Sequence, residues 1–234
     1  MSERGSSHSQ GSDNLSVLFD SWALFRLVLL SLVIVQNCFS SDSEREFAYQ
    51  QIMQASNARE RVILDAGTQK FYGLFTEAEK NPSKNAVLLL HDTGAYPDQQ
   101  SVIRLLRTEL PKYRWSALAI QLPLRESGAG DEDYYGLFPE AQQRIQAGLA
   151  YLTQQEYRNI VIVGYGLGSL MALNIQAEKN LSVTAMILIS LAVPSSGRPE
   201  VQSLELLKKI KIPLLDLFAE HDLEAVTGSA AQRR

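Results

Sequence analysis

The sequence predicts an α/β domain with a mostly parallel sheet that helices cover on both faces. Short apolar runs bounded by turn residues, such as 86–90, are typical of strands buried inside a parallel sheet. Segments with the apolar spacing of helices separate these runs, as βαβ units require. The third observation is the glycine-punctuated turn 164–168, which joins the strand-like run 159–163 to a helix-like stretch at 169–173.

The first half of the domain is expected to contain four strands and one helix. The strands are expected at residues 61–65, 70–75, 86–90 and 115–120. Pro97 and Asp98 are expected to open the helix, because the apolar residues that follow keep one face. These apolar residues are Val102, Leu105, Leu106 and Leu110.

The second half continues the alternation of strands and helices. Residues 125–135 are expected to form a loop, and a helix is expected from Pro139, since proline is favourable at a first helical position. Its apolar side is formed by Ile145, Leu149 and Leu152. A short helix is expected at 204–210, and the remaining strands are expected at 159–163, 183–190 and 212–218.

Three regions are expected along the chain: a terminal region at 1–40, a polar helical linker at 41–58 and the α/β domain at 59–234. The first residues are rich in serine and glycine, which predicts disorder. The apolar run 27–35 is shorter than the roughly 20 residues that span a bilayer, but it fits the core of a signal peptide. With Trp22 to Val35 taken together, the segment is a possible membrane tether; a buried helix is the alternative. We therefore expect an exported protein, periplasmic or membrane-anchored.

Composition excludes several classes of function. The net charge is −4, with 22 basic and 26 acidic residues, so no excess of positive charge is present for nucleic acid. The single cysteine, Cys38, excludes a disulfide framework and a cysteine-based metal site. We expect no cofactor and no metal, and a small ligand or a protein as the partner.

Three local motifs carry the chemistry of the domain. Gly164-Tyr165-Gly166-Leu167-Gly168-Ser169 follows a strand and opens a helix. Leu90-His91-Asp92-Thr93-Gly94 follows another strand. The run 207–215 leads to Glu220-His221-Asp222.

The order of these motifs resembles the α/β-hydrolase superfamily over residues 61–222. Within it, the chain is most similar to a bacterial exported family of α/β-hydrolase-like proteins, a domain of unknown function in which some members lack the nucleophilic serine. Gly166 stands where that serine is usual, and Asp92 stands where glycine is usual. The elements that normally close the sheet after Asp222 are missing, so a truncated form is a further alternative.

The resemblance implies a degenerate catalytic set. Gly166 has no side chain with which to attack a substrate, and Asp222 stands in the position of the acid. Only 12 residues follow Asp222 (234 − 222), too few for the helix and strand that would precede a late histidine. His221 adjoins the acid position, and His91 precedes the loop expected to form the oxyanion hole.

The backbone amides of the turn are the candidate site. The N–H of Leu167 and an N–H near Thr93 are expected to converge at a helix N-terminus, where they would bind an anion or a carbonyl oxygen. The side chains expected to line a pocket there are His91, Asp92, Tyr165 and Ser169. Ser169 is alternatively a small residue required for helix packing.

Two other kinds of site are alternatives. A dinucleotide fingerprint at Gly164, Gly166 and Gly168 lacks the acidic residue that should end the next strand. The acidic run 131–133, followed by Tyr134 and Tyr135, is a candidate cation site or, alternatively, a solvated turn that shapes the mouth of a pocket.

Taken together, these features predict a non-catalytic, α/β-hydrolase-like protein of the cell envelope, with a role in ligand binding or interaction. The alternative is an esterase-like hydrolase that acts with an unconventional or incomplete catalytic set, for which Asp222, His91 and Ser169 are the candidates.

Overall fold

The structure is a computed structural model that describes residues 41–56, 59–67, 69–79 and 83–233. The expected disordered terminus, signal-like run and tether Trp22 to Val35 lie outside these residues. Residues 41–233 belong to one compact unit. No helix in this part of the chain has both the length and the apolar character needed to cross a membrane.

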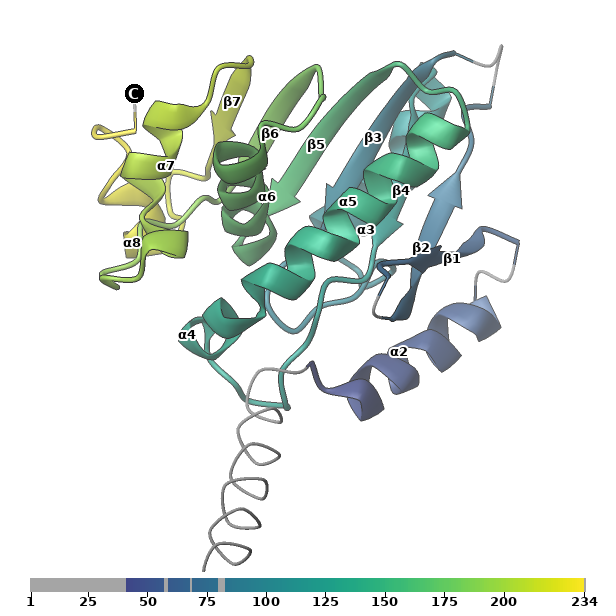
Figure 1. The fold of residues 1–234 in the computed structure, drawn as a ribbon, viewed down its shortest axis with the longest axis horizontal. Coiled ribbons are helices and arrows are strands. Elements are labelled where there is room, and N and C mark those ends of the chain that lie inside the picture. Colours follow the sequence, from purple (N-terminus) through teal and green to yellow (C-terminus); the bar gives the residue numbers. More distant parts are fainter. Residues whose placement is uncertain (1–40, 57–58, 68, 80–82, 234) are drawn as a thin grey trace, which may run out of the picture. The chain divides into compact units, whose positions relative to one another are not determined.

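The core of the unit is a seven-stranded mixed sheet with the order β1-β2-β4-β3-β5-β6-β7 (Figure 1). Five neighbouring strands, from β4 to β7, are parallel, whereas β1 and β2 are antiparallel additions at one edge. This confirms the predicted α/β class and its mostly parallel sheet. The strands are β1 (Arg61–Asp65), β2 (Lys70–Thr76), β3 (Asn85–Leu90), β4 (Ser116–Ile120), β5 (Asn159–Tyr165), β6 (Ala185–Ile189) and β7 (Leu214–Leu217).

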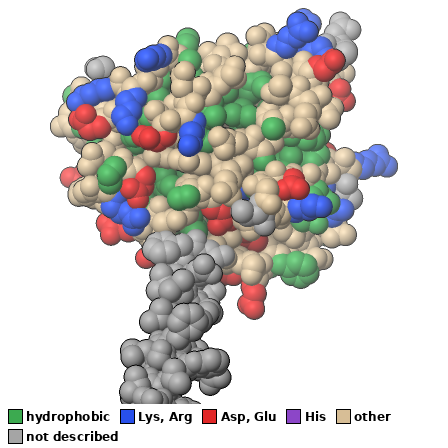
Figure 2. Space-filling view, in the orientation of Figure 1, with side chains coloured by type: hydrophobic (Ala, Val, Ile, Leu, Met, Phe, Trp, Pro, Cys, Tyr) green, Lys and Arg blue, Asp and Glu red, His purple; other side chains and the backbone are tan. Residues whose placement is uncertain are grey.

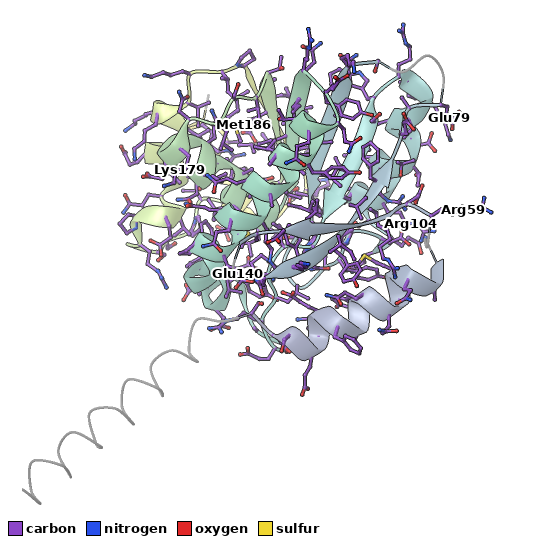
Figure 3. The ribbon with its side chains drawn as sticks, turned by 45° about the vertical axis from the view of Figure 1, so that its right-hand side comes forward. Arg59, Glu79, Arg104, Glu140, Lys179 and Met186 are labelled. Carbon is purple, nitrogen blue, oxygen red and sulfur yellow. The ribbon has the colours of Figure 1, made fainter. Side chains whose placement is uncertain are left out.

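Helices lie on both faces of the sheet. The larger core cluster lies beneath α5 (Phe138–Gln154), α6 (Leu167–Lys179) and α7 (Ser203–Lys209), and α5 and α6 are in front of the sheet in Figure 1. Figure 2 shows the surface of this side, on which basic and acidic side chains are interspersed. The smaller cluster, on the other face, contains residues of α3 (Val102–Glu109). Figure 3 labels one residue on each side, Met186 of β6 in the larger cluster and Arg104 on α3. The short elements are η2 (Leu110–Tyr113), α4 (Asp131–Tyr134), η3 (Tyr135–Leu137), η4 (Pro199–Val201) and α8 (Glu224–Thr227).

Three local expectations were wrong. The predicted helix start at Pro97 and Asp98 lies in turns, and α3 begins four residues after Asp98. The Asp98 carboxylate does not cap a helix but accepts a hydrogen bond from Arg107 Nη2 at 2.6 Å. Leu105 was expected on the buried face of this helix but is 61% exposed, and Ile103 is fully buried instead. The expected loop 125–135 contains α4.

The segment expected as a linker forms helix α2 (Ser43–Ser56), which packs on the domain. Glu46 of this helix is buried, and its carboxylate accepts hydrogen bonds from Arg144 Nη2 of α5 at 2.9 Å. The same Arg144 nitrogen pairs with Glu140, which is labelled on α5 in Figure 3. Because a charge buried without a partner is costly, this cluster fixes α2 to α5.

Candidate functional site

The candidate site surrounds Gly166, where the chain leaves β5 and enters α6. Gly166 has φ 54° and ψ −121°, a backbone conformation that residues with a side chain rarely adopt. Its N–H donates to the carbonyl of Ile189, at the end of the neighbouring strand β6. This is the sharp strand-to-helix bend that the sequence predicted, with no functional group at its apex.

The Asp92 carboxylate fills the space above this bend. Asp92 follows β3, and its Oδ1 accepts hydrogen bonds from the Leu167 N–H at 2.8 Å and from its neighbour's amide, the Thr93 N–H, at 2.7 Å. A Cβ atom on Gly166 would lie 2.6 Å from Asp92 Oδ2 and would overlap Oδ1 and Cγ. The two amides do converge, but the acceptor between them belongs to the protein itself.

The electrostatics of the site follow from this arrangement. Burial raises the pKa of the Asp92 carboxyl, while the two amide hydrogen bonds lower it and the nearby Asp131 carboxylate raises it. The Thr93 hydroxyl donates to Asp131 Oδ1 at 2.5 Å. Burial also raises the pKa of the Tyr165 phenol, with smaller contributions from Asp92 and Asp222. In a hydrolase the two amides at this place would donate to a substrate oxygen. Here they donate to Asp92, so the groups that the site presents are carboxylate and hydroxyl oxygens.

His91 is buried and serves as a structural link. Its Nε2 accepts hydrogen bonds from the Leu122 N–H at 2.9 Å and from Gln121 Nε2 at 3.0 Å. The proton therefore resides on Nδ1, which donates to the carbonyl of Asp92 at 2.8 Å. Burial lowers the pKa of His91 to about 4. The ring is neutral, fully engaged and 2% exposed, so it joins the loops after β3 and β4 and has no free nitrogen to act as a base.

Ser169 is also engaged in structure. Its hydroxyl donates to the carbonyl of Ile189 at 2.8 Å and accepts from the Ile189 N–H at 3.1 Å, and the residue is fully buried. The glycines on either side of the bend, Gly164 and Gly168, allow the start of α6 to lie close to the ends of β5 and β3. A Cβ on Gly164 would lie 2.5 Å from the Ser169 Cα, and one on Gly168 would lie 2.5 Å from the His91 carbonyl oxygen.

Asp222 follows β7 and has a hydroxyl, not an imidazole, as its side-chain partner. Ser190 Oγ donates to Asp222 Oδ2 at 2.6 Å, and the Leu223 N–H donates to Oδ1 at 2.8 Å. The hydrogen bond from Ser190 lowers the pKa of Asp222. Ser190 itself has a positive φ of 55°. His221 is exposed and makes no contact with this pair among the described hydrogen bonds.

Helix α2 contributes residues that sequence reasoning missed. Arg45 Nη2 and the Tyr49 hydroxyl both donate to the Gly94 carbonyl, at 2.9 and 3.0 Å, and Tyr49 stacks on Tyr96 with ring centroids 4.6 Å apart. These contacts fix the loop that carries Asp92. The polar composition of the segment gave no signal for this role, because an arginine on a polar helix is usually solvated.

The acidic run after the loop is a helix start. Asp133 Oδ2 accepts from the Gly130 N–H at 2.9 Å, which caps α4, and Asp131 accepts from Thr93 as above. Within the described residues, no group of three or more histidine, cysteine, aspartate or glutamate side chains is placed to hold a metal ion.

Comparisons with known proteins agree with this fold. The family model described as "Protein of unknown function (DUF3530)" matches residues 39–133 and 137–234. No curated protein matches the chain by sequence.

Several solved structures have a similar fold. A cold-adapted esterase from an Arctic intertidal metagenomic library superposes with a TM-score of 0.58 at 16% identity, over 74% of this chain and 78% of the esterase. Est1E from Butyrivibrio proteoclasticus gives 0.57 at 12% identity, over 74% and 83% of the two chains. TT1662 from Thermus thermophilus gives 0.57 at 18% identity, over 75% and 82%. At such identities the likeness shows an α/β-hydrolase fold and does not extend to activity.

Proposed function

Since the chain belongs to the family "Protein of unknown function (DUF3530)", we propose that it is a non-catalytic member of the α/β-hydrolase fold. In this proposal it acts at the cell envelope and binds a small ligand or a protein without turning it over. One observation carries the proposal: the Asp92 carboxylate accepts both amides that a hydrolase would use for an oxyanion.

Acyl transfer needs a nucleophile, a base and free donors for the developing oxyanion. Gly166 supplies no nucleophile, and the nitrogens of His91 are engaged inside the fold. Loss of a nucleophile alone costs about 10⁶ in kcat in a serine protease. These three unmet requirements support the proposal that the chain does not hydrolyse esters by the usual route.

The site also favours a particular polarity of ligand. Asp92 presents a negative oxygen where an esterase presents N–H groups, with the Asp131 carboxylate and the Tyr165 phenol nearby. A ligand that reaches the bend would therefore offer a hydrogen-bond donor or a positive charge. Acetate and phosphate would be repelled.

Hydrolysis and covalent labelling test the first part of this proposal. We expect the full chain to hydrolyse p-nitrophenyl acetate no faster than buffer does, and a fluorophosphonate probe to label no serine. Labelling of Ser169, or turnover that the Asp92→Asn substitution abolishes, would instead favour an esterase-like enzyme with an unconventional catalytic set.

Anion binding tests the blocked amides directly. In a ¹⁵N–¹H spectrum, acetate should leave the Leu167 and Thr93 signals of the wild-type chain unmoved. The Asp92→Gly variant frees both amides, so the same titration should shift both signals. Cell fractionation tests the proposed envelope location: the protein should be recovered outside the cytoplasmic fraction.

A further inference from the structure

Strand β1 forms one edge of the sheet and pairs with β2 on one side (Figure 1). Two hydrogen bonds at the ends of this pair define its pattern. The Phe75 N–H donates to the Glu60 carbonyl at 2.7 Å, and the Ala66 N–H donates to the Gln69 carbonyl at 3.0 Å. In an antiparallel pair, every second residue directs both of its backbone groups at the partner strand. The even-numbered residues from 60 to 66 are therefore the ones that face β2.

The other residues of β1 direct their backbone groups away from the sheet. These residues are Arg61, Ile63 and Asp65, and we call their N–H and C=O groups the free edge. In the described part of the chain, no hydrogen bond reaches these groups. The elements that contact β1 extensively are β2 beside it and α5 on one of its faces. Arg59, which precedes β1, points away from the molecule in Figure 3. Unpaired groups on an edge strand are a template for pairing with another strand.

The side chains of the same three residues lie on one face of β1, because strand side chains alternate between faces. Ile63 is 58% exposed, Asp65 is exposed and Arg61 is partly exposed. The Arg61 guanidinium lies over the Tyr72 ring, 5.5 Å from its centroid. Asp65 Oδ1 accepts from the Gly67 N–H at 2.8 Å. Within the described residues, neither charged side chain is in an ion pair, so both are available to a partner.

The order of charges along β1 is self-complementary. Arg61 and Asp65 lie two residues on either side of Ile63. When two copies of this strand pair antiparallel about a twofold axis at Ile63, Arg61 of each copy faces Asp65 of the other. The three outward residues then form three pairs that each exchange two hydrogen bonds. Charges of one sign on an edge strand repel a second copy, whereas opposite signs at these two positions attract it.

We propose that the free edge is a self-association surface, at which two copies of this chain pair β1 with β1 in antiparallel orientation. The two seven-stranded sheets then form one continuous sheet across a twofold axis. The two Ile63 side chains pack against each other at the axis, and an Arg61–Asp65 ion pair flanks them on either side. A pair of five-residue strands buries less than the roughly 1,200 Å² of a standard interface, so the dimer is in reversible equilibrium with the monomer.

Charge reversal in the full chain tests the pairing and its register. Sedimentation velocity should show a monomer–dimer equilibrium for the wild type. Arg61→Asp and Asp65→Arg each place like charges opposite each other twice, so each variant alone should dimerise roughly ten- to hundred-fold more weakly. A mixture of the two variants restores both opposite-charge pairs and should form heterodimers. Arg158→Asp is the matched control, because it changes the net charge as Arg61→Asp does on exposed chain before β5, and it should leave dimerisation unchanged.

Amide hydrogen exchange identifies the edge without any substitution. The N–H groups of Val62 and Leu64 bond to β2 and should be protected at every protein concentration. Those of Arg61, Ile63 and Asp65 should exchange rapidly in dilute protein and become protected as the concentration rises. Ile63→Pro removes one outward N–H and leaves the bonds between β1 and β2 in place, so it should abolish this protection and the dimer.

Four results would overturn the proposal. The first is a wild-type chain that stays monomeric up to about 1 mM. The second is a dimer that neither charge reversal weakens, and the third is a mixture of the two variants that forms no heterodimer. The fourth is protection of the outward amides that does not depend on protein concentration, which would show that a segment of the same chain covers the edge.

Discussion

A serine at the bend should destabilise this protein, and by more when Asp92 is present than when it is removed. In Gly166→Ser the new Cβ overlaps Asp92 Oδ1 and Cγ, so the carboxylate must leave the amides of Leu167 and Thr93. Each buried donor left without a partner costs about 1–3 kcal/mol, and a side chain at this φ and ψ costs about 1–3 kcal/mol more. With water satisfying one of the two amides, the single substitution should therefore lower the free energy of unfolding by roughly 2–6 kcal/mol.

In the Asp92→Gly background the same serine meets no carboxylate, so only the backbone strain of about 1–3 kcal/mol remains. The strain is the same in both backgrounds, so urea unfolding of the four proteins in this cycle should give a coupling energy of roughly 1–3 kcal/mol, the cost of the unpaired amide. Asp92→Asn is the matched control, because it keeps the volume and the acceptor and should rescue nothing. If Gly166→Ser costs the same with and without Asp92, the carboxylate is not locked above the bend and the reasoning fails.

Three further outcomes are expected. The folded protein holds His91 neutral with a pKa of about 4, so the contribution of His91 to stability is present above pH 6.5 and is lost as the pH falls from 6.5 toward 4. The full loss is about 3 kcal/mol. His91→Gln should remove this pH dependence from urea unfolding curves. Arg144→Met leaves two carboxylates without their buried cation and should cost about 3–5 kcal/mol in thermal unfolding, whereas Lys208→Met in an exposed pair should change stability by less than about 0.5 kcal/mol. Ser169→Ala breaks two hydrogen bonds with Ile189 and should cost about 1–3 kcal/mol, while fluorophosphonate labelling should not change; a Ser169-dependent label would contradict this.

Much of the fold follows from the sequence because local patterns determine it. The uninterrupted apolar run of β3 and the glycine turn after β5 place two neighbouring strands with their carboxyl ends together. The start of α3 was misjudged because Asp98 resembles a helix cap, whereas its carboxylate is recruited by Arg107, nine residues further along the chain. Hydrophobic periodicity does not indicate a polar contact between side chains this far apart in the sequence.

The sequence predicted the backbone bend of the site, but it did not predict that a side chain of the protein would accept the hydrogen bonds of its two amides. The departures from the hydrolase pattern at positions 92 and 166 are both visible in the sequence. The two departures are linked in the structure, because the carboxylate of Asp92, after β3, occupies the space above Gly166, after β5. This contact joins two residues 74 positions apart (166 − 92), so the sequence pattern does not reveal it. The roles of Arg45 and Tyr49 on the Gly94 carbonyl were equally hidden, since packing between distant segments decides them.

The close contact between α6 and the ends of β3 and β5 has a consequence for how glycine signatures are interpreted. Gly164 and Gly168 are required wherever a helix starts this near a neighbouring backbone, whether or not a reaction takes place there. The spacing of these two glycines therefore indicates close packing, and turnover has to be judged from the apex, position 166, and from position 92, which faces it. If the proposed function holds, an inventory of esterases drawn up from such spacings would include inert proteins, and a joint inspection of the apex and the residue facing it would remove them.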